Sequence, residues 1–522
     1  MLQISTLKKR LLPALVISFL CNYVSFSQIT PGVLQQFIAQ SKYANNKNIQ
    51  EMYVLLQYKT AWIQKSNSNN LVVFLNTLKQ SADAGLREED YQYDFIKPFL
   101  NKKILLSNAD DSLQAEIIFT EAAIHFYNDI AFGNIKPPFG YNGLKYVPEC
   151  RNISALLAQY ISTNTLSSLF KLLSGTLPEI IALQHKLTWF NRITAGADFK
   201  EVNITSNTLS NTNKPLIIKL WQLGLLDSAN FNLTDSILKK KVKEAQVQFS
   251  LLNDGVLRST LLQEMNIPLS TRIKQLQLSL NYFRWLQCIS QQQTVIVVNI
   301  PAAYLKVYRF NKVILEMRMV VGKRSTPTPT LTSVVNEVIL YPYWHVPYSI
   351  ATKEILPILK RNPGYINSGN YQVLNRAGNI VDPYSVNWKT LSRSYFPYLI
   401  RQSTGCDNAL GLLKLNFNNP FSVYLHDTNK KNVFNYNKRF YSHGCMRMEK
   451  PMELGHLLLK NNLIAIDTLE QKGCLRNQSP VAVPVDDKFP VIVWYNPAGV
   501  DSSGRVLFFD DIYNKFKGTT NH

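Results

Sequence analysis

Long hydrophobic runs are rare in this chain of 522 residues, and the clear one lies at the amino terminus. Beyond residue 20, no segment reaches the ~18 uninterrupted apolar residues that a membrane-spanning helix needs. Long charge runs and low-complexity tracts are also missing, and 46% hydrophobic and 17% charged residues are typical of globular protein. The chain is too long for one hydrophobic core, so about two to four domains are expected.

Acidic residues are scarce, with 35 Asp and Glu against 56 Lys and Arg, a net charge of +21. Such a surplus can indicate nucleic-acid binding. However, the chain shows no nucleic-acid-binding motif, so nucleic acid is not an expected partner. An anionic polymer of the cell envelope, or a merely solvated basic surface, fits the surplus better.

The amino terminus has the pattern of a secretory signal peptide. Lys8, Lys9 and Arg10 precede the apolar run 11–20, and Ser25 and Ser27 provide small residues before a cleavage site after residue 27. The run is too short to span a membrane comfortably, which disfavours an anchor. The sequence therefore predicts export, with membrane attachment only if the signal stays uncut.

Cysteine is scarce too, and the count is informative. Removal of residues 1–27 leaves five cysteines, which are Cys150, Cys288, Cys406, Cys445 and Cys474. Five is odd, so at least one thiol stays unpaired within the monomer. Cys445 is the candidate for that thiol, and the pairing of the other four stays open.

The composition of the chain and the spacing of its apolar residues change along its length. Residues 31–193 have apolar residues at helical spacing, and a polar stretch over 201–214 is typical of a linker. A short helical block follows to residue 286, after which residues 294–322 are rich in β-branched residues. Residues 354–398 are irregular, as expected of a lid or binding loop inserted in a β domain.

A histidine and a cysteine carry the clearest chemical signal. His426 closes a predicted strand, and Cys445 follows it by 445 − 426 = 19 residues. A histidine can take the proton of a thiol and return it to a leaving or incoming group. Gly444 would let the backbone turn its N–H groups toward a developing oxyanion. Arg447 could hold a carboxylate by a two-pronged contact.

Two other roles for these residues have to be weighed. His426, His443, Cys445 and His456 could form a zinc site, although structural zinc sites usually have tighter paired spacing. Cys445 could instead be half of a structural disulfide, the usual state of exported cysteines.

The segment YLHDTNKKNVFNYNKRFYSHGCMRM resembles the active-site signature of the L,D-transpeptidases, which is a histidine followed by a Ser-His-Gly-Cys-x-Arg turn. Residues 341–357, 401–419 and 489–515 resemble the large periplasmic branch of that family. SADAGLREEDYQYD and YNDIAFGNIKPP are similar to its helical scaffold. The resemblance implies an α+β multidomain protein. Its implied parts are a signal peptide (1–27), a helical scaffold domain (28–200), a peptidoglycan-binding-like domain (215–286), a mostly-β catalytic domain (292–472) with a capping loop (354–398), and a C-terminal extension (485–522).

The resemblance also implies roles for single residues. Cys445 matches the nucleophile and His426 the proton acceptor and donor. His443 matches a structural or substrate-orienting neighbour, and Asp427 could orient the base, although a backbone carbonyl often serves. Ser442, Gly444 and Arg447 match the rest of the turn, and Tyr424 and Trp388 are expected to contact substrate.

The implied reaction is acyl transfer through a thioester, which needs no metal or organic cofactor. Cys445 would attack the third residue of a peptidoglycan tetrapeptide stem and release D-alanine. An amine of a second stem would then complete a 3→3 crosslink. Carbapenems would be expected inhibitors. The alternatives are an L,D-carboxypeptidase or a stem-protein anchoring enzyme with the same thioester, and a non-catalytic wall-binding scaffold.

Two departures from the family pattern are visible. Residues 215–286 keep Ala245, Phe249 and an Asp254-Gly255 pair but lack the usual spacer and following glycine. Glycan contact by that block and a degenerate spacer therefore both stay open, as does a partnership with cell-wall synthesis proteins. Cys406 stands where the family pattern has no cysteine.

Overall fold

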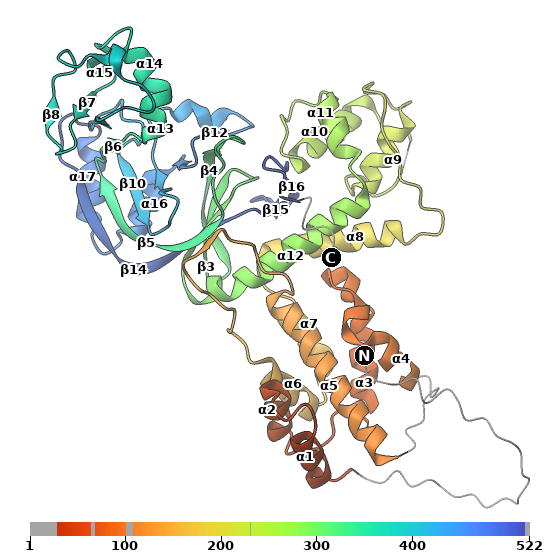
Figure 1. Cartoon of the computed structure of the whole chain (residues 1–522). Helices are drawn as coiled ribbons and strands as arrows, with labels where there is room; N and C mark the ends of the chain where they lie inside the picture. Colours follow the sequence, from red (N-terminus) through yellow and green to blue (C-terminus); the bar gives the residue numbers. More distant parts are fainter. Residues whose placement is uncertain (1–28, 64–67, 101–107, 230, 517–522) are drawn as a thin grey trace, which may run out of the picture.

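The computed structural model describes residues 29–63, 68–100, 108–229 and 231–516. The predicted signal peptide lies outside these residues. In the described part of the chain, no single helix is long and apolar enough to cross a membrane. One sharply bent pair, Leu166–Leu173 with Pro178–Thr194, passes that test only when both members are taken together. The architecture confirms the prediction of an α+β multidomain protein (Figure 1).

The amino-terminal part is an all-helical unit packed around one long helix, α5 (Ala109–Phe132). Asn108 caps the start of α5 by accepting the Asp111 N–H, and Gly133 ends it. Phe119 and Phe126 of α5 are fully buried among the surrounding helices. Those helices are α1 (Pro31–Gln40), α2 (Lys47–Leu55), α3 (Ser68–Leu78), α4 (Tyr93–Leu100), α6 (Ile153–Ser162) and α7 (Leu169–Leu173).

A second helical core lies beside the first. It joins α8 (Pro178–Thr194), α9 (Lys214–Gln222), α10 (Asp235–Gln248), α11 (Ser259–Met265), α12 (Leu269–Gln292) and the hairpin β15–β16 (Ala498–Val500, Val506–Phe508). Helix α8 falls in the range predicted for the scaffold, yet it packs here, with Phe190 stacked on Phe508 at 6.4 Å. The predicted linker is docked rather than free, because the Asn266 side chain hydrogen-bonds both backbone groups of the buried Ile204.

Helix α12 lies between the amino-terminal helical unit and the carboxyl-terminal half, and it forms hydrogen bonds with both (Figure 1). From α12, Arg284 donates to the Ala84 carbonyl at 2.7 Å and Gln287 to the Ala131 carbonyl at 2.8 Å. On the side of the carboxyl-terminal segment, Ser279 donates to the Asn496 side chain at 2.6 Å. All three side chains are buried, so these bonds are shielded from water.

The carboxyl-terminal half is built on a ten-stranded sheet. Its order is β1-β5-β10-β11-β13-β4-β3-β2-β14, with β12 beside β4, and the pairing of β14 with β5 closes it. The predicted extension was expected to start at residue 485, which lies inside β14, so the sheet continues through that boundary. The strands are β1 (Tyr141–Asn142), β2 (Val295–Asn299), β3 (Tyr304–Arg309), β4 (Lys312–Gly322), β5 (Leu331–Leu340), β10 (Leu413–Phe417), β11 (Leu425–His426), β12 (Phe440–Ser442), β13 (Met446–Met448) and β14 (Val481–Trp494).

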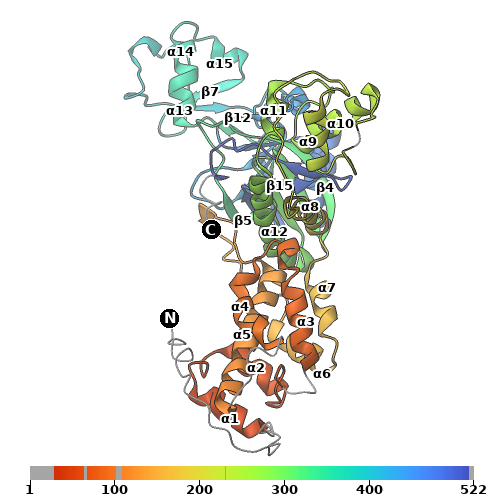
Figure 2. The same ribbon diagram turned by 90° about the vertical axis from the view of Figure 1, so that its right-hand side faces the viewer.

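The predicted capping loop forms part of a small folded lid, residues 344–402. Four strands in the order β6-β9-β7-β8 make its sheet, and α13 to α15 pack on it. In Figure 2 this lid stands apart from the scaffold helices, at the opposite end of the molecule. Its strands and helices are β6 (Trp344–His345), α13 (Tyr348–Ile350), α14 (Leu356–Leu359), α15 (Tyr365–Ser368), β7 (Tyr371–Leu374), β8 (Ile380–Val381) and β9 (Leu399–Gln402).

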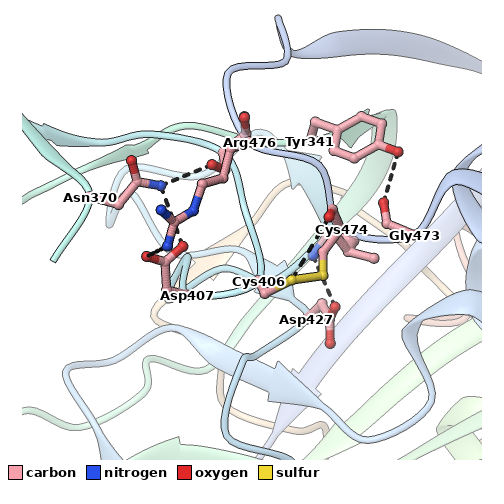
Figure 3. Close-up of a disulfide and its surroundings, with 10 residues drawn as sticks. Tyr341, Asn370, Cys406, Asp407, Asp427, Gly473, Cys474 and Arg476 are labelled. Atoms are coloured by element: carbon pink, nitrogen blue, oxygen red, sulfur yellow. Dashed lines mark hydrogen bonds and ion pairs between the residues drawn. A yellow bond between two sulfur atoms is a disulfide. The ribbon is translucent and has the colours of Figure 1, made fainter. Parts of the chain in front are cut away.

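The structure resolves the cysteine pairing that the sequence left open. Cys150 is bonded to Cys288 and Cys406 to Cys474, while Cys445 is free. The prediction that Cys445 is the unpaired thiol is confirmed, and its alternative role in a structural disulfide is wrong. Figure 3 shows the Cys406–Cys474 bond close to Asp427, which adjoins His426.

Replacing Cys406 and Cys474 together by alanine is expected to lower the free energy of unfolding by about 4 kcal/mol, since the bond closes a loop of 68 residues. Urea unfolding followed by tryptophan fluorescence measures the loss. Reduction of the parent protein, which also breaks the Cys150–Cys288 bond, should shift the midpoint in the same direction and at least as far. An unchanged midpoint in both would contradict the prediction.

Candidate active site

His426 and Cys445 are brought together by two neighbouring parallel strands. β11 pairs with β13 in the register Leu425 with Met446 and His426 with Arg447. Leu425 and Met446 are fully buried in the sheet core. Since side chains alternate along a strand, His426, Cys445 and Arg447 all lie on the opposite face. The predicted pair therefore shares one surface of the sheet.

The imidazole of His426 is held in a single tautomer. Its Nδ1 lies 2.5 Å from the backbone oxygen of Asp427, which can only accept, so Nδ1 carries the proton. The other ring nitrogen, Nε2, is then an acceptor. Burial, and next the positive charge of Arg447, lower the pKa of His426 to about 3. The resting imidazole is therefore neutral and able to take a proton.

The side chain of Asp427 has a different task from the predicted one. Its carboxylate is buried and accepts the backbone N–H groups of Thr428 at 2.6 Å and Leu412 at 2.9 Å. It also forms an ion pair with Lys431. Asp427 thus orients His426 through its backbone oxygen, while its carboxylate holds the turn that carries that oxygen.

The Cys445 thiol is partly exposed and faces Tyr424. Burial raises the pKa of the Cys445 thiol above its ordinary value of 9.0, although hydrogen bonds from Tyr424 oppose the rise. Burial and the bond to Cys445 raise the pKa of Tyr424, whereas a hydrogen bond with Trp344 lowers it. Trp344 belongs to β6 of the lid, so the lid is linked to the nucleophile through Tyr424.

Two cations flank the pair. Lys414, which the sequence did not reveal, pairs with His426 in the register of β10 and β11, and its Nζ lies 4.2 Å from the Tyr424 ring centre. Burial lowers the pKa of Lys414, and the charge of Cys445 raises it. Among the described residues, Nε of Arg447 is buried with no hydrogen-bond partner. Both cations favour negative charge at the thiol, since burial strengthens electrostatic contacts.

The turn before the thiol is locked by its own hydrogen bonds. Ser442 Oγ donates to the Cys445 carbonyl at 2.5 Å and accepts the Gly444 N–H at 3.1 Å. The Gly444 N–H is therefore occupied, in contrast to its predicted direction toward an oxyanion. Gly444 has φ of 117°, a backbone conformation that residues with a side chain rarely adopt. This explains why a glycine occupies the position before the thiol. Thr328 donates to the Gly444 carbonyl at 2.8 Å and fixes the turn from outside.

His443 connects the turn to the lid. Its Nε2 lies 2.7 Å from Glu354 Oε1, and both side chains are well exposed. Glu354 belongs to a short π-helical segment, Ala351–Ile355, of the lid. This contact fits the predicted structural role of His443. Residues 341–357 resemble the family, but the sequence gave neither Glu354 nor Trp344 a role at the thiol, because both lie about 70 to 90 residues before the motif.

Trp388, predicted to contact substrate, is a packing residue of the lid. It is 3% exposed, and its indole donates to the Pro383 carbonyl at 2.7 Å. Its ring centre lies 6.1 Å from that of Tyr398 in the same core. The structure thus gives Trp388 a supporting position in place of direct contact with a ligand.

The alternative of a zinc site built on the motif does not fit. Among the residues described, a metal-sized group of three ligand atoms forms at His456, Asp467 and Glu470, without His426, His443 or Cys445. His456 lies on α16 (Pro451–Leu458) and faces α17 (Leu463–Lys472), where its Nε2 is 3.1 Å from Asp467 Oδ1. The motif residues therefore do not converge as metal ligands.

The pKa directions predict how the thiol reacts with pH. Alkylation of Cys445 by iodoacetamide should rise up to about tenfold per pH unit from pH 6 to 9, because its raised pKa leaves little thiolate at neutral pH. Mass spectrometry of the carbamidomethylated peptide measures the rate. An alkylation rate that stays constant between pH 5 and 8 would contradict a neutral thiol beside a neutral imidazole. It would show a stable pair of thiolate and imidazolium.

Two parts of the chain match known protein families. Residues 293–466 match the family YkuD, described as the L,D-transpeptidase catalytic domain, and residues 47–187 match the Scaffold domain. A protein of Haemophilus influenzae named "Putative L,D-transpeptidase" is 36% identical over 218 residues, which are 42% of this chain and 44% of that protein. The match thus spans less than half the length of this curated relative.

Solved structures of L,D-transpeptidases are also similar to parts of the chain. The one from Mycobacterium smegmatis has 15% identity and a TM-score of 0.18, and the match covers 38% of this chain and 58% of that chain. Mycobacterium tuberculosis L,D-transpeptidase 1 has 15% identity and a TM-score of 0.15, with 38% and 60% covered. TM-scores of this size establish no likeness of overall fold.

Proposed function

We propose that the protein is a peptidoglycan L,D-transpeptidase with Cys445 as its nucleophile, on the premise that residues 293–466 match the L,D-transpeptidase catalytic domain. The observation that carries the proposal is one free thiol on the same sheet face as a neutral imidazole whose Nε2 can accept a proton. The proposed product is a 3→3 crosslink between two peptide stems.

The first half of the reaction makes a thioester. The thiol proton moves to His426 Nε2 as the sulfur attacks the carbonyl carbon of the third stem residue. His426 then gives this proton to the nitrogen of D-alanine, which leaves as a neutral amine. A His426 pKa near 3 makes the imidazolium a short-lived and strong acid, suited to rapid donation. Lys414 and Arg447 would stabilise the negative charge of this step.

The second half transfers the acyl group. The side-chain amine of a neighbouring stem attacks the thioester carbonyl and gives its proton to His426. The carbon–sulfur bond breaks, and the proton returns to the Cys445 sulfur. Arg447 lies beside His426 in the strand register, and there its guanidinium would hold a stem carboxylate.

Water as the acceptor would give an L,D-carboxypeptidase, and a protein amine would give a stem-anchoring enzyme. The sheet face described above does not distinguish these acceptors. A wall-binding scaffold with a dead site is disfavoured, because binding alone gives no reason for a buried histidine held in one tautomer beside a free thiol. We propose that the enzyme acts on stems outside the cytoplasm, after export by the predicted signal peptide.

Incubation of the purified protein with disaccharide-tetrapeptide tests the proposal. Dimers joined at the third residue, identified by mass spectrometry, are the expected product. Tripeptide alone would support the carboxypeptidase. An adduct of a carbapenem on Cys445 is expected, and the absence of both adduct and turnover would support the dead scaffold.

A further inference from the structure

A cavity of about 410 Å³ lies over strands β2, β3 and β4 of the sheet. Neither His426 nor Cys445 lines it. Its floor comes from β2, β3 and β4, and its walls come from the end of α10, the hairpin β15–β16 and the segment 437–440. Two parts of the protein therefore share it, the second helical core and the catalytic sheet. The volume is in the usual range for sites that bind small organic molecules.

Aromatic side chains form part of the lining of this cavity, among polar and charged residues. Phe283, Tyr304, Phe440, Trp494 and Phe509 all line it. Aromatic rings offer flat apolar surfaces with a polar edge, on which the C–H faces of a sugar ring can stack. Such a lining suits a ligand that is apolar on its faces and polar around its rim.

Three polar groups in the cavity have spare hydrogen-bonding capacity. Trp494 is 2% exposed, and its Nε1 has no hydrogen-bond partner among the described residues, which is costly for a buried donor. Tyr304 also lines the cavity, and its hydroxyl can both donate and accept a hydrogen bond. The Glu316 carboxylate lies 3.9 Å from Lys306 Nζ, which is longer than a hydrogen bond, so it can still accept one from a ligand. One donor, one hydroxyl and one strong acceptor match sugar hydroxyls, which both donate and accept.

The charges in the cavity argue against an anionic ligand. Lys306 donates to the Val500 carbonyl at 2.6 Å and lies 3.2 Å from buried Glu179. Arg505 is paired with Asp501 at 2.7 Å. The Arg439 guanidinium donates to several backbone carbonyls, among them those of Met319 and Ala303. The cations are thus occupied within the protein, and a neutral ligand fits best.

The cavity is connected to the catalytic turn through β12. Phe440, in the cavity wall, starts this strand, and Cys445 follows by 445 − 440 = 5 residues. Five residues span at most about 18 Å. A peptide of three residues spans at most about 11 Å, so the group that links the sugar to the peptide would have to cover the rest of that distance.

We propose that this cavity binds the disaccharide that carries the peptide stem, so that the stem runs along β12 toward Cys445. The inference rests on the proposed function, because it assigns the sugar portion of that same substrate. It also places glycan contact between residues 215–286 and the catalytic sheet, rather than on the helical block alone.

Calorimetric titration of the Cys445→Ala protein with chitobiose, a disaccharide without any peptide, tests the site separately from catalysis. Saturable binding is expected, and Tyr304→Phe and Glu316→Gln should each raise Kd about three- to tenfold, the usual cost of one hydrogen bond. Glu337→Gln is a matched control, since Glu337 accepts from Asn416 on a different part of the sheet and does not line the cavity. It should leave Kd unchanged.

The outcomes are distinguishable. Binding that both variants weaken, in a protein without crosslinking activity, would support the saccharide site and reject the proposed function. No binding of chitobiose, or equal binding by parent and both variants, would overturn the site whether or not crosslinks form. In an active enzyme, Tyr304→Phe should raise KM for disaccharide-tetrapeptide and leave KM for the free tetrapeptide unchanged. Equal effects on both substrates would also overturn it.

Discussion

Cys445→Ala should reduce turnover of disaccharide-tetrapeptide by about 10⁴-fold or more, since removal of a nucleophile removes the covalent route altogether. Tyr424, Lys414 and Arg447 surround the sulfur and would remain in place. The variant should therefore fold normally, with a thermal midpoint within a few degrees of the parent. Single-turnover assays by mass spectrometry measure the loss, and circular dichroism checks the fold.

Cys445→Ser provides the matched control for this prediction. A hydroxyl keeps the shape of the thiol, but it is a far weaker acid than the thiol and a neutral imidazole of pKa about 3 cannot ionise it appreciably. The serine variant should be as inactive as the alanine variant toward tetrapeptide and should lose the carbapenem adduct. Residual turnover above about one per cent in either variant would assign catalysis to another group.

His426→Gln should reduce turnover by about 10²- to 10⁴-fold, the usual contribution of a general base. Glutamine is close to histidine in size, and its amide can still donate to the Asp427 carbonyl that now accepts from Nδ1. The matched control is His456→Gln, on the exposed surface of α16, which should keep full activity. Equal losses in the two variants would contradict the assignment of His426 as the base.

The same substitution should change the acid stability of the protein. The pKa of His426 is about 3 when folded against 6.5 ordinarily, so the unfolded chain binds the extra proton between these values. The free energy of unfolding therefore falls as pH drops from 6.5 toward 3, by up to about 1.4 kcal/mol per unit, and is fully retained above 6.5. His426→Gln should flatten this decline in urea titrations at pH 7 and pH 4. An identical decline in the variant would show that His426 is not buried as a neutral group.

Much of the site could be predicted from the chain because its parts are close in sequence. His426 and the turn 442–447 lie within 22 residues and carry their chemistry in residue type, so their pairing needed little tertiary information. Lys414 and Trp344 lie in segments that resemble the family, but their place at the site was not predicted, since a lysine and a tryptophan have many ordinary uses. Only the register of β10 with β11 and the fold of the lid bring them beside the thiol.

The boundaries of the folded parts were harder to infer. β14 continues through residue 485 because its partner strands come from far earlier in the chain, about 150 residues for β5 and about 195 for β2, and such pairing leaves no local trace. The irregular composition of residues 354–398 gave no sign of the small sheet with its own core to which they belong. Trp388 is buried in that core for the same reason.

The sequence by itself predicted a free thiol near a histidine, since five cysteines remain after the predicted signal peptide and one of them lies in a Ser-His-Gly-Cys turn. The tertiary structure alone decided the protonation state and the supports of that pair. Burial keeps the imidazole neutral, and the Asp427 backbone oxygen fixes its tautomer. Both effects depend on what surrounds a group in space, and the order of residues along the chain does not encode that directly.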